Sequence, residues 1–352
     1  MKVALSLPGG GVSGALYQIG AVAALEEAMG GVSRIDGYIG HAGGSILAAA
    51  LAGGVSATRL YRAVLDPADP YFPLERHHVL SLDAGEWRRI VVRAWATLRQ
   101  ALPRLDPRRA HAPVGVSERI LEEVDRIEDS LPAGIFTLDR FEPFIAEFFA
   151  RREIPNAFSA TRKPLRIVAY ELDTGKRVVF GEEANDTRIS LACAASCALP
   201  LFFSPVRIGR KHYVDGGLSS MAHFDVAERM SADFTIVLNP RVPVETDGQS
   251  VPTGHGAGRS VRDKGLLWVF NQSRRIANHA MLEREMQTRP NGMGVLRIEP
   301  KPEEAALFLR NPRSFESRRV VLEYAFKTTR EMLRTWSETN QPLAASLGLS
   351  TN

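Results

Sequence analysis

A tight, glycine-rich turn runs from Gly40 to Gly44, between a short apolar segment and a run of small residues. Its frame, Gly40-x-Ala42-x-Gly44, is that of the nucleophile elbow G-x-S-x-G with alanine at the position of the serine. In such an elbow a sharp strand-to-helix turn raises one side chain above the sheet, and the flanking glycines let the substrate approach. The pattern therefore predicts an acyl-transfer site whose nucleophile position holds a methyl group.

A second glycine run, Gly9 to Gly14, follows the first apolar segment. It fits the dinucleotide fingerprint G-x-G-x-x-G, and Asp36 stands where the acidic residue of that fingerprint is expected. A glycine loop that leads into a helix also presents backbone N–H groups to an oxyanion. The loop alone leaves phosphate binding, oxyanion binding and a purely structural turn open. The elbow favours an oxyanion hole, because acyl transfer needs one beside the nucleophile.

An aspartate stands at the end of a predicted strand, in the sequence Tyr-Val-Asp-Gly-Gly that ends at Gly217. A carboxylate at that place can face the elbow of a neighbouring strand, so Asp215 is the candidate general base. His41 and His223 are alternatives for completing a triad, although nothing in the sequence places either of them there. Ser45 is a possible substitute nucleophile, but almost one helical turn separates it from residue 42, so we expect it to point into the helix.

The composition is that of a globular protein, with 352 residues of which 45% are hydrophobic and 24% charged. The formal net charge of +4 is too small to indicate a nucleic-acid partner. No stretch approaches the roughly 18 apolar residues of a membrane span, and the apolar run at the start is too short for a signal peptide. Cys193 and Cys197 suit neither a redox pair nor a zinc site and are expected to be free, buried thiols. We expect a cytoplasmic location and neither a metal nor a cofactor.

Apolar strands and amphipathic helices alternate through about the first 240 residues, which favours one mostly parallel sheet covered by helices. The pattern predicts strands at 3–7, 35–39, 165–170, 177–180, 202–206 and 235–238. It predicts helices at 15–27, 44–52, 190–197, 266–284 and 315–338.

Between residues 59 and 155 arginines and aromatic residues become more frequent. Residues 87–102 are predicted to form a basic amphipathic helix, because Trp87, Val91, Trp95, Leu98 and Leu102 share one face and arginines lie elsewhere. Such a helix can lie on an anionic lipid surface, although most amphipathic helices pack on their own domain.

In their order and spacing, these motifs resemble those of patatin-like phospholipases over roughly residues 1–245. The resemblance is carried by the Gly9–Gly14 run, the elbow at Ala42, Asp173-Thr174-Gly175, the Ala-Ser-x-Ala-x-Pro run that ends at Pro200, and Asp215-Gly216-Gly217. It implies a three-layer α/β/α fold with a mostly parallel central sheet, a helical insertion and a helical C-terminal region. It also implies a lipid acyl hydrolase with a Ser-Asp dyad and no catalytic histidine.

Carried over residue by residue, the resemblance makes Ala42 the nucleophile position and Asp215 the base. It forms the oxyanion hole from the backbone N–H groups of Gly10 and Gly11. The remaining motif glycines are Gly9, Gly14, Gly40, Gly44, Gly216 and Gly217. The sequence departs from the pattern at Ala42, because a methyl group cannot attack a carbonyl, and at Ser13, where many relatives carry a basic residue.

Two interpretations of Ala42 follow. The favoured one is a nucleophile-silenced serine-to-alanine form of a working hydrolase, since Asp215 and the glycines are intact. The alternative is a natural pseudoenzyme that binds lipid or acyl chains without hydrolysis. In both, residues 1–352 form a single domain, residues 59–155 contribute to an acyl pocket or lid, and residues 259–352 form a helical extension packed on the core. The expected partner is a lipid or acyl ester, with a peripheral membrane contact near Trp87–Leu102.

Overall fold

The computed structural model describes residues 1–31, 34–66, 88, 132–182, 187–246, 250–253, 255–309 and 315–349. The predicted basic helix at 87–102, apart from residue 88, and most of the predicted insertion at 59–155 lie outside these residues.

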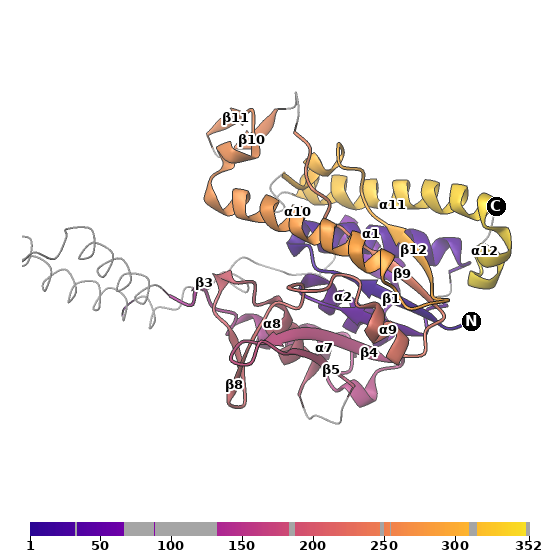
Figure 1. The fold of residues 1–352 in the computed structure, drawn as a ribbon, viewed down its shortest axis with the longest axis horizontal. Helices are drawn as coiled ribbons and strands as arrows, with labels where there is room; N and C mark the ends of the chain where they lie inside the picture. Colours follow the sequence, from indigo (N-terminus) through magenta and orange to yellow (C-terminus); the bar gives the residue numbers. More distant parts are fainter. Residues whose placement is uncertain are drawn as a thin grey trace, which may run out of the picture.

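An eight-stranded sheet forms the centre of the molecule (Figure 1). Its main path runs in the order β12-β9-β1-β2-β4-β8-β7, and β5 pairs with β4 off this path. The five strands from β12 to β4 are parallel, whereas β5, β7 and β8 are antiparallel to their neighbours. The strands are β1 (Val3–Leu7), β2 (Gly37–Gly40), β4 (Leu165–Glu171), β5 (Arg177–Phe180), β7 (Val206–Ile208), β8 (Lys211–Val214), β9 (Phe234–Leu238) and β12 (Gly294–Ile298). The prediction of a mostly parallel sheet is confirmed.

Helices cover both faces of this sheet, because its central strands are apolar on both sides. Leu5 and Ile167 point to the face that α1, α2 and α8 cover, whereas Ala4 and Ile39 point to the face that α9 and the end of α10 cover. The helices are α1 (Gly11–Ala28), α2 (Gly43–Ala52), α3 (Ala57–Leu65), α7 (Phe141–Ala150), α8 (Ile189–Cys197), α9 (Phe224–Arg229), α10 (Leu266–Gln287), α11 (Phe315–Thr339) and α12 (Gln341–Leu347). The three-layer α/β/α prediction is confirmed.

Two small sheets and three short 3-10 helices complete the described structure. The small sheets join β3 (Gly134–Phe136) to β6 (Leu201–Phe203) and β10 (Val251–Thr253) to β11 (Gly256–Gly258). The 3-10 helices are η2 (Phe158–Ala160), η3 (Val261–Lys264) and η4 (Ala305–Leu309).

The C-terminal region packs on the layer that α1 forms, and Figure 1 shows α11 running alongside α1. Gly20 makes this close contact possible, since a Cβ there would lie only 2.4 Å from the carbonyl oxygen of Leu322. The sequence predicted a helical C-terminal region, and the structure adds one strand to its helices. Gly294–Ile298 form β12, which adds a parallel strand beside β9.

Within the part of the chain that the structure describes, no helix is both long and apolar enough to cross a bilayer.

Candidate active site

The turn between β2 and α2 holds residue 42 in a strained backbone conformation. Ala42 has φ 48° and ψ −134°, which a residue with a Cβ rarely adopts. Its N–H donates to Ser196 Oγ (2.8 Å), and that hydroxyl donates to the carbonyl of Val168 (2.6 Å). The turn is too crowded for a side chain at Gly44, where a Cβ would lie 1.9 Å from the carbonyl oxygen of Leu7. The predicted elbow geometry is therefore present around an alanine.

The first glycine run lies against this elbow. A Cβ at Gly9 would lie 2.4 Å from the Cβ of Ala42, so only a glycine lets the two segments approach this closely. Helix α1 begins at Gly11, which has φ +63°, three residues before the glycine run ends. Because the first N–H groups of a helix have no partner within it, the amides at this start are free to bind an anion.

Asp215 follows β8 and is buried, with 1% of its surface exposed. Its Oδ1 accepts from the N–H of Gly217 (2.8 Å) and from Arg274 Nη2 (3.3 Å). Its Oδ2 is also buried and has no hydrogen-bond partner among the residues that the structure describes. The carboxylate therefore has one oxygen fixed by two donors and one oxygen with an unused lone pair.

The Asp-Gly-Gly turn and the elbow meet over β4. A Cβ at Gly216 would lie 2.1 Å from the Val168 carbonyl oxygen, the atom that accepts from Ser196, and 2.7 Å from the Cβ of His41. The structure thus brings His41, which precedes Ala42, into contact with Gly216, which follows Asp215.

His41 and His223, the two histidines that the sequence left open, pair with each other. Their Nδ1 and Nε2 atoms are 3.1 Å apart, and both rings are buried. A Cβ at Gly217 would lie 2.8 Å from His41 Nε2 and 3.1 Å from Asp215 Oδ1, so the imidazole borders the carboxylate. Burial, with the charges of Arg241 and Arg274, lowers the pKa of His41 to about 3. Burial, and then His41, also lowers the pKa of His223. The pair is therefore neutral at physiological pH.

Asp36 stands at the wrong end of the sheet for a dinucleotide site. It precedes β2, and its carboxylate accepts from the N–H of Val3 at the beginning of β1 (2.8 Å). The glycine run follows the other end of β1. Because a ribose-binding carboxylate must lie on the same side as the glycine loop, this arrangement does not support the dinucleotide interpretation.

Comparison with known proteins decides the family. The family model for patatin-like phospholipase matches residues 5–228, which is more than half of the chain. The chain belongs to the patatin-like phospholipase family. No curated protein matches the sequence.

Three solved structures resemble this patatin-like chain. VipD from Legionella pneumophila is 14% identical with a TM-score of 0.43, over 95% of this chain and 67% of that one. A structure of full-length SpcU with full-length ExoU from Pseudomonas aeruginosa is 18% identical with a TM-score of 0.32, over 98% and 60% of the two chains. The type III effector ExoU is 19% identical with a TM-score of 0.36, over 94% and 52%. The chain thus spans about half to two-thirds of their lengths.

Two arginines from beyond the segment that the patatin-like family model matches reach this site. Arg274 of α10 contacts Asp215 Oδ1 and the carbonyl of Gly217, and Arg241, after β9, donates to the carbonyl of Gly9. Burial lowers the pKa of Arg241 to about 10, so its charge persists at neutral pH. The sequence analysis missed both residues. A signal for Arg274 was present, because Arg274-Arg275 are the only arginines in an otherwise apolar or neutral helical stretch from Leu266 to Leu282.

Three further nucleophilic side chains that the sequence singled out lie in α2 and α8. Ser45 is fully buried and donates to the carbonyl of Ala42 (2.6 Å), which fits the expectation that it points into the helix. Cys193 and Cys197 are free, and burial raises the pKa of the Cys193 thiol to about 12. Across the described residues, no group of three metal-ligating side chains occurs.

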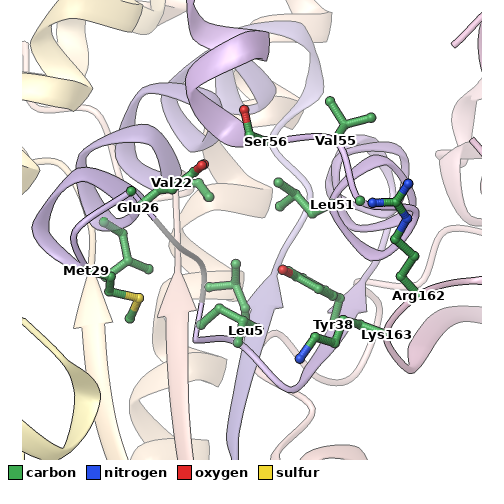
Figure 2. A pocket seen from close by; sticks show the side chains of 14 residues that line it. Leu5, Val22, Glu26, Met29, Tyr38, Leu51, Val55, Ser56, Arg162 and Lys163 are labelled. Carbon is green, nitrogen blue, oxygen red and sulfur yellow. The ribbon is translucent and has the colours of Figure 1, made fainter.

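A cavity of about 280 Å³ lies elsewhere, between the ends of α1 and α2 and the beginning of β2 (Figure 2). Leu5, Val22, Tyr38 and Leu51 line it, and none of the predicted site residues does. Its carboxylate, Glu26, accepts from the N–H of Ala57 (2.6 Å) and so caps the start of α3. The carboxylate in this cavity therefore stabilises the fold, and the cavity is separate from the elbow.

The neutral histidine pair predicts a stability that falls in mild acid. Because burial depresses the pKa of His41 from 6.5 to about 3, the unfolded chain takes up a proton below pH 6.5 and the folded chain does not. The stability that is fully present above pH 6.5 should therefore fall by about 2 kcal/mol between pH 7 and 5 through His41, and His223, whose pKa is also lowered, should add to this fall. Glu285, whose pKa burial raises, works in the opposite direction, whereas Asp225, with its pKa lowered to about 2, acts only in stronger acid.

Urea unfolding at pH 7 and pH 5 measures this difference. His223→Asn removes one titrating group and keeps a residue that tolerates the positive φ of this position, so the fall should be about halved. His212→Gln, at an exposed histidine outside the pair, is the control for the loss of an imidazole. An unaltered chain that is equally stable at both pH values would show that the histidines are not held neutral.

Proposed function

We propose that this chain has the catalytic frame of a lipid acyl hydrolase with a Ser-Asp dyad, silenced at residue 42. The observation that carries the proposal is the strained backbone of Ala42 (φ 48°) beside the glycine loop. An alanine gains nothing from such a conformation, and strained positions of this kind cluster at functional sites. Membership of the patatin-like phospholipase family supports a lipid ester as substrate.

Asp215 is proposed as the base because its two carboxylate oxygens differ in their hydrogen bonds. Gly217 and Arg274 occupy Oδ1 and fix the carboxylate, while Oδ2 keeps an unused lone pair in a buried position. In a chain that carries Ala42→Ser, the hydroxyl would give its proton to Oδ2 while its oxygen attacks the acyl carbonyl. The amides of Gly10 and Gly11 would stabilise the oxyanion.

The same groups complete the cycle. The leaving alcohol takes the proton from Asp215 as the carbon–oxygen bond breaks, and an acyl ester on residue 42 remains. A water molecule then gives a proton to Asp215 while its oxygen attacks the acyl ester. As the bond to residue 42 breaks and the fatty acid leaves, Asp215 returns this proton to the residue-42 oxygen. With Ala42 in place no lone pair can begin this sequence, so the chain is expected to bind substrate without turnover.

A natural lipid-binding pseudoenzyme is the second candidate, and Ala42 itself is the observation in its favour. Both candidates predict lipid binding by the unaltered chain. They differ in what the rest of the site can do once a hydroxyl is supplied, because a pseudoenzyme is under no constraint to keep a base and an oxyanion hole in register.

The deciding experiment installs the hydroxyl with Ala42→Ser. The altered chain should hydrolyse a short p-nitrophenyl ester and phosphatidylcholine at least about 10³-fold faster than the unaltered chain, and a fluorophosphonate should label residue 42. The unaltered chain is the blank for both measurements. A folded Ala42→Ser chain that neither hydrolyses an ester nor reacts with the fluorophosphonate would refute the hydrolase frame.

A further inference from the structure

Between Leu266 and Leu282, helix α10 directs its charged side chains inward and several apolar side chains outward. Its two arginines in this stretch face inward, with Arg275 5% exposed and the Arg274 side chain 14% exposed. Three of its large aliphatic side chains face outward, with Leu266 75%, Val269 42% and Ile276 55% exposed, whereas Leu282 at the end of the stretch is buried. A helix on the surface of a soluble domain normally shows the opposite arrangement. The outward face of α10 is therefore built for surroundings other than water.

This outward face is continuous and uncharged. Leu266, Val269, Ser273, Ile276 and Ala280 follow one another at spacings of three and four, so they lie on one side of the helix, and all are exposed. The only hydroxyl among them, Ser273, donates to the carbonyl of Val269 in its own helix (2.9 Å). Such a back-bonded serine presents little polarity to its surroundings.

The neighbouring side of α10 contacts the candidate active site. On the inner side of α10, Arg274 contacts Asp215, while the ring of Phe270 lies 6.2 Å from that of Phe202 in β6. Next to these contacts, Leu201 and Leu218 are 42% and 40% exposed. We call Leu201, Leu218, Leu266, Val269 and Ile276 together the apolar rim. An exposed apolar surface larger than scattered single residues marks an interaction surface.

We propose that the apolar rim docks on a lipid bilayer surface and so holds the candidate active site close to the lipid. The inference rests on the proposed function, in which the substrate is a lipid. The five residues of the rim are all aliphatic, whereas the aromatic and arginine side chains that commonly anchor protein partners lie beside the rim and not within it. It therefore fits acyl chains better than a specific protein surface.

The residues before α10 carry the charge that such a surface needs. Arg259 and Arg262 are exposed, and Lys264 Nζ lies 4.6 Å from the centre of the Trp268 ring, against a single acidic residue, Asp263, between them. Helices that lie in the interface of an anionic bilayer combine an aliphatic face with nearby cations. The beginning of α10 has this combination, with a lysine and a tryptophan side by side.

Vesicle flotation of the unaltered chain tests the proposal without turnover, because Ala42 leaves the lipid intact. The vesicles contain phosphatidylcholine with about 30% phosphatidylserine, an anionic fraction suited to the charges before α10. The double variant Leu266→Asp/Val269→Asp should weaken partitioning at least about tenfold. Leu172→Asp is the matched control, since Leu172 is 52% exposed beside β8 and outside the rim, and it should bind like the unaltered chain.

Three results would overturn the proposal. The unaltered chain could fail to float with the vesicles, the double variant could float equally well, or the unaltered chain could form a dimer in gel filtration that the double variant abolishes while neither floats. The last result would assign the rim to self-association. Hydrolysis of a soluble ester by the Ala42→Ser chain is independent of these readings, so a failure of the proposed function and a failure of docking remain distinguishable.

Discussion

In a chain carrying Ala42→Ser, the further change Asp215→Asn should lower ester hydrolysis by about 10³-fold or more. Asparagine keeps the shape of the side chain, and its oxygen can still accept from the N–H of Gly217. An amide nitrogen in place of Oδ2 cannot take the proton of the hydroxyl, so the nucleophile is not activated. The comparison is made on kcat with a short soluble ester, which keeps lipid binding out of the measurement.

Asp225→Asn in the same background is the control. Asp225 is a partly buried aspartate whose pKa is lowered to about 2, with hydrogen bonds from Arg177 and Arg229, and it does not contact the elbow. This change should reduce stability and leave kcat unaltered. If Asp215→Asn keeps its activity while His41→Gln abolishes it, the base is the histidine and the dyad assignment is wrong.

Gly44→Ala should destabilise the fold by about 3 kcal/mol or more, as expected for a side chain with no space. Its Cβ would lie 1.9 Å from the carbonyl oxygen and 2.7 Å from the carbonyl carbon of Leu7, both backbone atoms that a rotamer change cannot move. Leu7 ends β1 and leads into the glycine loop, so the displaced backbone also carries the proposed oxyanion hole. Urea unfolding gives the free-energy difference.

Gly43→Ala is the matched control one residue earlier. The nearest atom to a Cβ at Gly43 is the carbonyl oxygen of Gly11 at 3.4 Å, an ordinary contact, and both glycines stand in the first turn of α2. Alanine there should change the free energy of unfolding by less than about 1 kcal/mol. Equal effects of the two substitutions would show that the elbow does not press on β1.

Much of this fold could be predicted from local patterns in the sequence. The strand at 3–7 and the hairpin strand at 177–180 occur within the predicted bounds, and the helix at 190–197 begins one residue earlier. These segments combine an apolar run with a glycine, proline or aspartate at the end, so local chemistry defines them. Helix α1 begins at Gly11 rather than after Gly14, so the end of the glycine run is itself helical.

The contacts that complete the candidate site could not be predicted in this way. The Arg274–Asp215 pair joins residues 59 positions apart, and the Arg241–Gly9 contact joins residues 232 apart. Strand β12 is defined by its pairing with β9, from which the long helix α10 separates it in the sequence. Gly294–Ile298 alone is too short, and its residue types are too varied, to predict a strand. Residue types and spacing identify the groups that a turn presents, whereas the partners of those groups depend on the tertiary fold.

The order of the strands bears on where the chain can be cut. The family match ends at residue 228, yet β9 and β12 lie beyond it and cover one side of β1. A fragment trimmed to that match would leave β1, whose five residues are all buried, as an open edge. Such an unprotected apolar edge is a template for aggregation. The segment that matches the family model is therefore shorter than the segment that must be expressed to obtain a soluble protein.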